Sequence, residues 1–129
     1  MKYKYRSEGE RMTTFYWYPK CSTCKKAIAW LDEHNIEYKL IDMIETPPTK
    51  EQLIHWMETN DYPIRRFFNT SGVRYREQHL KDIVNDFSKE EAATRLTADG
   101  MLIKRPILEV GEKVLLGFKE ADYEALLLK

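Results

Sequence analysis

The only two cysteines of the chain, Cys21 and Cys24, lie three residues apart at a predicted strand-to-helix junction. A β-branched and aromatic run at 13–18 precedes them and is closed by Pro19, which is typical of a buried strand that ends at a turn. From about Ser22 to His34, apolar residues at helical spacing predict a helix. Two thiols at the start of a helix indicate redox chemistry.

The positions of the two thiols predict a division of labour. Unpaired amides and the positive dipole end of a helix N-terminus favour a thiolate at Cys21. Lys20, Lys25 and Lys26 add positive charge nearby, although Lys25 and Lys26 could equally be solvated surface residues. Cys24, one turn further along the core-facing side, can attack a mixed disulfide formed at Cys21. We therefore expect Cys21 to be the nucleophile and Cys24 the resolving thiol.

Two simpler interpretations of the cysteine pair are less favoured. Inert core cysteines need neither this spacing nor the surrounding lysines. A structural zinc site takes four ligands, and the sequence has no second cysteine pair and no histidine pair at ligand spacing. We expect no metal and no resident cofactor, with glutathione, thioredoxin or glutaredoxin as the external reductant.

Composition excludes several other classes of function. Lysine plus arginine balance aspartate plus glutamate at 21 each, so no net field attracts nucleic acid or an anionic membrane. No apolar stretch approaches the roughly 20 residues of a membrane span, and residues 1–11 lack a signal peptide's apolar region. Two cysteines do not make a secreted disulfide scaffold, so we expect a cytoplasmic protein.

The rest of the sequence predicts one α/β domain over residues 12–129, preceded by a charged and weakly packed extension at 1–11. A strand at 37–42 would complete a βαβ unit with the first strand and helix. An α-helical insertion at about 48–100 follows, with helices predicted at 49–60, 79–86 and 88–98. Strands at 106–110 and 113–116 and a helix at 119–128 then complete a thioredoxin-like fold with an α-helical insertion.

Four motifs, in order along the chain, resemble the arsenate reductase (ArsC/Spx-like) family of the thioredoxin-like superfamily. They are Tyr18-Pro19-Lys20-Cys21-Ser22-Thr23-Cys24-Lys25-Lys26-Ala27, Phe68-Asn69-Thr70-Ser71-Gly72 with Tyr75-Arg76-Glu77, the run from Asp99 to Leu108, and Leu116-Gly117-Phe118-Lys119. A Cys-x-x-Cys motif alone would be a weak signal. The four motifs together, spanning residues 13 to about 127, are fairly specific.

The resemblance implies further site residues besides a redox-active Cys21. It implies that Arg105 precedes a cis-proline, Pro106, that faces the cysteine. An X-Pro bond is the one place where a cis peptide costs little, and a guanidinium fits an oxyanion or a glutathione carboxylate. We assign substrate contacts to Lys20, Ser22, Thr23 and Pro106.

The sequence also departs from the arsenate-reducing members that it resembles. Members that use glutathione and glutaredoxin have one cysteine in the active loop and two further arginines that grip the oxyanion. At the corresponding places this chain has Phe67-Phe68-Asn69 and Phe118, so we do not expect efficient arsenate reduction. The second cysteine resembles the Spx branch, whose members use a Cys-x-x-Cys disulfide switch and bind RNA polymerase.

Two functions therefore stay open at this point. As an enzyme, the protein would reduce an oxidised substrate through Cys21 and Cys24, with Arg105 steadying the developing charge. As a regulator, the same disulfide would alter the surface presented to RNA polymerase or another protein. The Asn-Thr-Ser-Gly and Gly-Met-Leu-Ile-Lys-Arg-Pro motifs resemble a third, uncharacterised set of relatives, which we favour.

Overall fold

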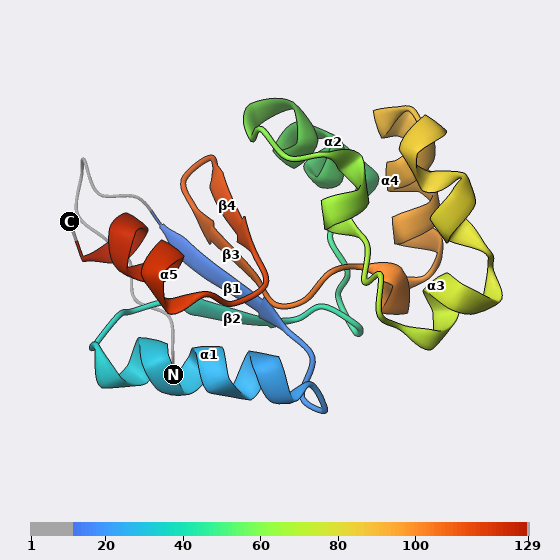
Figure 1. Cartoon of the computed structure of the whole chain (residues 1–129). Helices are drawn as coiled ribbons and strands as arrows, with labels where there is room; N and C mark the ends of the chain where they lie inside the picture. The colour runs from blue at the N-terminus through green and yellow to red at the C-terminus, as the bar shows by residue number, and fades with distance from the viewer. Residues whose placement is uncertain (1–11, 129) are drawn as a thin grey trace. The chain divides into compact units, whose positions relative to one another are not determined.

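The computed structural model describes residues 12–128, which divide into two compact units (Figure 1). The sheet unit contains the described residues up to Asp42 and those from Arg105 onward. The helical unit contains Met43–Lys104. The predicted weak packing of residues 1–11 lies outside the described residues. In the described part of the chain, no helix is long and apolar enough to cross a membrane.

The sheet unit is built on four strands in the order β2-β1-β3-β4. Helix α1 (Ser22–Glu33) connects β1 to β2, and these two strands are parallel, as predicted from a right-handed crossover. Strand β3 pairs antiparallel with β1, and β4 pairs antiparallel with β3. Phe15 in the central β1 is thus opposite Leu40 on one side and Leu108 on the other. The strands are β1 (Thr13–Trp17), β2 (Lys39–Asp42), β3 (Ile107–Val110) and β4 (Lys113–Leu116).

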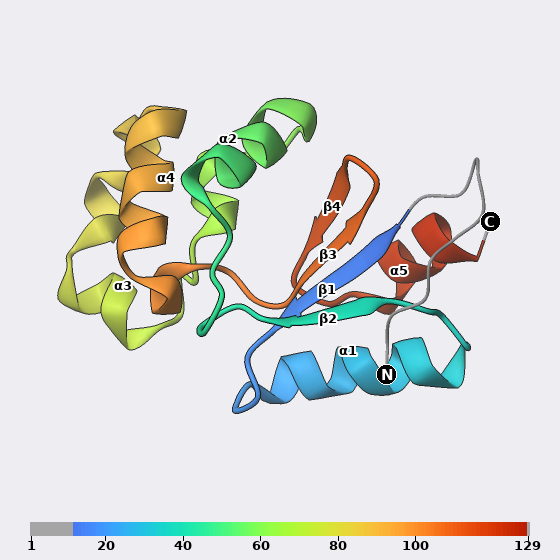
Figure 2. The ribbon, with the colours of Figure 1, turned by 180° about the vertical axis from the view of Figure 1, so that it is seen from behind.

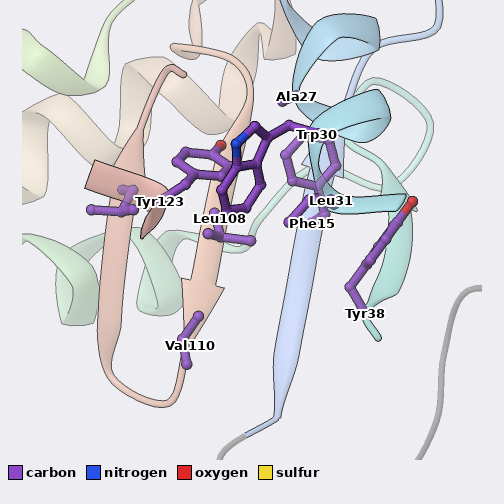
Figure 3. Packing of buried hydrophobic residues seen from close by; sticks show 9 residues of the cluster. Phe15, Ala27, Trp30, Leu31, Tyr38, Leu108, Val110 and Tyr123 are labelled. Carbon is purple, nitrogen blue, oxygen red and sulfur yellow. The ribbon is translucent and has the colours of Figure 1, made fainter. Parts of the chain in front are cut away.

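Side chains from the sheet, from α1 and from α5 (Glu120–Leu127) form one buried apolar cluster (Figure 3). Trp30 of α1 meets Tyr123 of α5 edge to face, with ring centroids 5.7 Å apart. The Tyr123 hydroxyl donates a hydrogen bond of 3.0 Å to the carbonyl of Gly117, which satisfies the polar end of this buried ring. This packing fixes α1, and with it the cysteine pair, against the sheet.

The helical unit contains α2 (Lys50–Thr59) and α4 (Lys89–Ala98), which lie side by side in both views of the chain (Figures 1 and 2). Each begins at a predicted cap. The Thr49 hydroxyl accepts a hydrogen bond from the Gln52 amide, and the Ser88 hydroxyl accepts one from the Glu91 amide. The other elements are short: η1 (Ile64–Phe67), α3 (Val73–Glu77), η2 (Leu80–Asp82), η3 (Val84–Asp86) and η4 (Gly100–Leu102).

The predicted helix at 79–86 is wrong. His79 adopts a left-handed backbone conformation with φ 55°, and two separate 3₁₀ turns, η2 and η3, follow it. Leu80 and Val84 are buried at helical spacing without forming an α-helix. The short helix α3 was not predicted. Elsewhere the predicted order of strands and helices is confirmed, with their ends shifted by a residue or two.

Candidate redox site

Cys21 is the N-cap residue of α1. Its Sγ accepts a hydrogen bond of 3.2 Å from the backbone amide of Cys24, in the way that a serine or threonine oxygen caps a helix. Its own amide donates to the carbonyl of Tyr18 over 2.9 Å, which closes the turn after β1. The sulfur therefore lies at the N-terminal, electropositive end of a twelve-residue helix, as predicted.

The two thiols differ in exposure. Cys21 is partly exposed, whereas Cys24 has a relative accessibility of 0%. Both are free thiols. A large reagent can thus approach Cys21 but not Cys24. Within residues 12–128, no group of three or more histidine, cysteine, aspartate and glutamate side chains is placed to hold a metal ion.

The pKa of the Cys24 thiol is raised from 9.0 to about 12, and burial is the largest cause. The interaction with the Cys21 side chain and the charge of that residue contribute to the rise, while the backbone of Tyr18 and the charge of Arg105 oppose it. At neutral pH Cys24 therefore keeps its proton, and it can donate a hydrogen bond to the sulfur of Cys21.

Arg105 lies two residues before β3 and close to the cysteine pair, since its charge acts on the Cys24 thiol. Its guanidinium carbon lies 5.2 Å from the centroid of the Tyr18 ring, in a cation–π arrangement. The Arg105–Pro106 peptide bond is cis, which confirms the prediction. Pro106 is buried, and its carbonyl accepts a hydrogen bond of 2.8 Å from the Gly117 amide.

The remaining predicted site residues are on the surface of the same loop and first helical turn. Lys20, Ser22 and Thr23 are exposed, and their side chains form no hydrogen bond or ion pair with any residue in the described part of the chain. The amides of Ser22 and Thr23 belong to the first turn of α1, where no intrahelical acceptor exists. The structure thus brings Cys21, Cys24 and Arg105 together and leaves the polar loop residues open to solvent.

Two tyrosines of this site were not predicted as functional residues. Tyr18 supplies the ring under Arg105 and a backbone interaction with Cys24. Burial raises the pKa of Tyr123, and the charge of Cys24 raises it further, so the Tyr123 hydroxyl remains protonated beside that thiol. Tyr18 could have been predicted as a site residue from its position directly before the Pro-Lys-Cys turn. Tyr123 gave no such signal, because a tyrosine in a C-terminal helix is ordinary core material.

This sheet, with two thiols at the start of its first helix, is the arrangement of a thioredoxin-like protein. The model of the ArsC family matches residues 16–126, so the chain belongs to the ArsC family. It is 50% identical over 111 residues to the uncharacterized protein YusI of Bacillus subtilis, covering 86% of this chain and 94% of that protein. The global transcriptional regulator Spx of Lactiplantibacillus plantarum is 26% identical, over 90% of this chain and 86% of its own length.

A solved structure agrees with this assignment. The crystal structure of a possible arsenate reductase from Streptococcus mutans is 45% identical and superposes with a TM-score of 0.83, covering 90% of this chain and 98% of that one. The predicted fold class, α/β and thioredoxin-like with a helical insertion, is thereby confirmed, as is the resemblance to the ArsC and Spx proteins.

Proposed function

We propose that the protein is a thiol–disulfide oxidoreductase in which Cys21 is the nucleophile and Cys24 the resolving thiol. One observation carries the proposal: the fully buried Cys24 donates its amide hydrogen to the sulfur of the partly exposed Cys21 at the N-cap of α1. A substrate can approach only the outer sulfur, and the inner thiol lies within reach of the mixed disulfide that results.

The reaction takes place in two exchanges. The thiolate of Cys21 attacks one sulfur of a substrate disulfide, a mixed disulfide forms, and the other substrate sulfur leaves as a thiolate that takes up a proton. Cys24 then loses its proton and attacks the Cys21 sulfur. The Cys21–Cys24 disulfide forms, and the second substrate sulfur is released as a thiol. The substrate gains two electrons, which a small thiol, thioredoxin or glutaredoxin later restores to the protein.

The mixed disulfide itself promotes the second exchange. Two of the causes that raise the pKa of Cys24 are its hydrogen bond to Cys21 and the charge of Cys21, and both are lost when Cys21 becomes part of a disulfide. The opposing effects of Tyr18 and Arg105 remain. Deprotonation of Cys24 is thus easier in the intermediate than in the reduced protein, which is when it is needed.

We assign binding roles to the polar groups around Cys21. The guanidinium of Arg105 suits a carboxylate or oxyanion of the substrate, and we assign a substrate contact to Pro106, the next residue. Lys20 and the first-turn residues Ser22 and Thr23 would contact the part of the substrate that faces solvent. We also propose a cytoplasmic location, because thiol reductants are abundant there.

A turnover screen tests this proposal. The reduced protein is supplied with oxidised glutathione, with a glutathionylated peptide and with arsenate, with thioredoxin or glutaredoxin regenerating the thiols. We expect turnover of at least one of the two disulfides and its complete loss in Cys21→Ser. If neither disulfide were turned over, the proposal that the protein is a thiol–disulfide oxidoreductase would be rejected.

A regulatory function is the alternative, supported by the similarity to Spx and by the shared Cys-x-x-Cys arrangement. In that case the Cys21–Cys24 disulfide is the output, and RNA polymerase is the partner. Capture of RNA polymerase by the immobilised protein, compared between the oxidised wild type and Cys24→Ser, tests it. Redox-dependent capture without turnover would favour the regulator.

A further inference from the structure

A basic hollow of about 430 Å³ lies within the helical unit. The cysteine pair belongs to the sheet unit, so the hollow is a separate site. Four cationic side chains line it: Arg65, Arg66, Lys81 and Lys104. Thr70 and the buried rings of Phe68 and Tyr75 complete the lining, and no acidic residue contributes to it within the described part of the chain. The volume of the hollow lies within the usual range for small-molecule binding sites, about 300–1,000 Å³.

A second hollow of about 390 Å³ shares Thr70, Tyr75 and Lys81 with the first. Two further basic side chains, Arg76 and His79, line it together with a single carboxylate, Asp82. The positive lining thus extends beyond the first hollow, and Asp82 is the one carboxylate among the residues that line the two hollows. The positive charge of this region is therefore not confined to Arg65 and Arg66.

The four cations of the first hollow are not neutralised. None of them forms an ion pair with a residue in 12–128. The side chain of Arg66 contacts an aromatic ring instead, with its guanidinium carbon 5.2 Å from the centroid of the Tyr62 ring. Other cations of the helical unit do have carboxylate partners, in the pairs Arg74–Asp99, Lys50–Glu90 and Arg95–Glu91. In a chain of zero net charge, this is a local excess of positive charge that attracts anions.

Backbone hydrogen bonds hold the walls of the hollow in place. The amide of Lys104 donates to the carbonyl of Phe67 over 2.8 Å, and the amide of Asn69 donates to the carbonyl of Leu102 over 2.7 Å. Phe68 also forms an isolated β-bridge with Ile103. The segment that carries Arg65 and Arg66 is therefore tied to the segment that carries Lys104, so the backbone that bears these three basic side chains is held in place at the hollow.

We propose that this hollow binds a small polyanion that carries two phosphate groups. Each phosphate group has a charge of roughly −1.5 to −2 at neutral pH, so two of them balance four cations. Guanidinium groups bind phosphate oxygens in a bidentate manner, lysines act as point charges, and the Thr70 hydroxyl can donate one more hydrogen bond. The site goes beyond the proposed thiol chemistry and does not depend on it.

Isothermal titration calorimetry of the full chain at low salt tests the proposal with three probes. Pyrophosphate supplies the diphosphate group alone, ADP supplies it on an organic body, and citrate supplies carboxylates instead. We expect both diphosphates to bind and citrate, whose total charge is similar, to bind at least about tenfold more weakly, because each carboxylate offers two coplanar oxygens where a terminal phosphate group offers three. Binding should weaken as salt is added.

Single substitutions locate the site. Arg66→Gln and Lys81→Gln should each lower the affinity for pyrophosphate on the order of tenfold, as expected for one lost charge-assisted hydrogen bond. Lys89→Gln, which removes an exposed lysine of the same unit outside both hollows, should leave the affinity unchanged. Circular dichroism of each variant verifies that the fold is intact.

Several outcomes would overturn the proposal. Loss of binding in Arg105→Gln with retention in Lys81→Gln would place the anion at the redox site instead. Equal affinity for citrate would remove the specificity for phosphate, and tighter binding of an oligonucleotide than of either diphosphate would indicate nucleic acid. No heat of binding at low salt would reject the site. Because Cys21→Ser should bind pyrophosphate normally, failure here is separable from failure of the redox function.

Discussion

The backbone amide of Cys24 donates a hydrogen bond to the Sγ of Cys21 over 3.2 Å, which places the two redox candidates on one helical turn in a fixed geometry. The same turn exposes one sulfur and buries the other. A helix N-cap thus places the two cysteines in different environments within one helical turn. The contrast between the two thiols is the basis of most of the predictions below.

Selective alkylation is the most direct consequence of that contrast. At neutral pH, iodoacetamide should modify Cys21 and leave Cys24 intact, because Cys24 is inaccessible and its pKa is raised to about 12. Peptide mass spectrometry after brief labelling measures both sites. In denaturant both cysteines should react, which serves as the control. Equal labelling of the two thiols in the folded protein would contradict the assigned roles.

The two cysteine variants should behave differently with oxidised glutathione. Cys24→Ser should form one mixed disulfide at Cys21 and then stall, because no thiol remains to displace the glutathione. Cys21→Ser should form no adduct, since the remaining thiol is buried. Intact-mass spectrometry detects the added glutathione. If Cys21→Ser formed the adduct as fast as Cys24→Ser, the attacking and resolving roles would have to be exchanged.

The sequence predicted the elements that have local signals of their own. Thr49 and Ser88 marked the starts of α2 and α4 because their hydroxyls cap those helices, and Pro19 marked the end of β1. The segment after His79 could not be predicted in the same way. Leu80 and Val84 have helical spacing, but the left-handed backbone of His79 precedes the segment and Ile83 divides it into two 3₁₀ turns, so the spacing of the buried residues alone does not determine the conformation.

The candidate site was predictable only in part, for a similar reason. Cys21 and Cys24 are neighbours in sequence, so their spacing was informative, and Arg105 entered through the family resemblance. The basic hollow was not predicted. Arg65, Lys81 and Lys104 are distant from one another in the sequence, and each by itself is typical of a solvated surface residue. Only the fold brings them around one space.

Arsenate should be a poor substrate, even with glutathione and glutaredoxin supplied. Arg105 is the only arginine that matches those expected to grip the oxyanion. Phe118 occupies one of the other positions, and its ring packs edge to face against Tyr123 with centroids 4.8 Å apart, so it offers no charge. A coupled NADPH assay measures the rate. Arsenate turnover as fast as that of a disulfide substrate would show that another group stabilises the oxyanion.

Arg105 should matter more for an anionic substrate than for a neutral one. Arg105→Gln removes the guanidinium that would face a substrate carboxylate, so kcat/KM for oxidised glutathione should fall on the order of tenfold. For a neutral disulfide such as hydroxyethyl disulfide, the fall should be only a few fold. Tyr18→Phe keeps the ring beneath the guanidinium and serves as the matched control. An equal loss for both substrates would assign Arg105 to the fold rather than to substrate binding.

The free energy of unfolding should decrease as the pH rises from about 9 to about 12, in part because of Cys24. In the unfolded chain this thiol titrates near 9.0, whereas burial raises its pKa in the folded protein to about 12. Between these values the folded state holds a proton that the unfolded state has lost, so stability that is fully present below pH 9 is lost with rising pH. The contribution has a slope of at most about 1.4 kcal/mol per pH unit.

Urea denaturation of the wild type and Cys24→Ala at several values of pH between 8 and 11 measures this slope. The alanine variant should show a shallower decrease, since it has no thiol to titrate. Tyr38 and Tyr123, whose pKa values burial also raises, contribute a decrease of the same sign that remains in both proteins. Cys21→Ser should keep most of the slope, because burial is the largest cause of the shift at Cys24 and does not require Cys21. Parallel curves for the wild type and Cys24→Ala would show that Cys24 is not held protonated in the folded protein, and the order of attack and resolution would lose its physical basis.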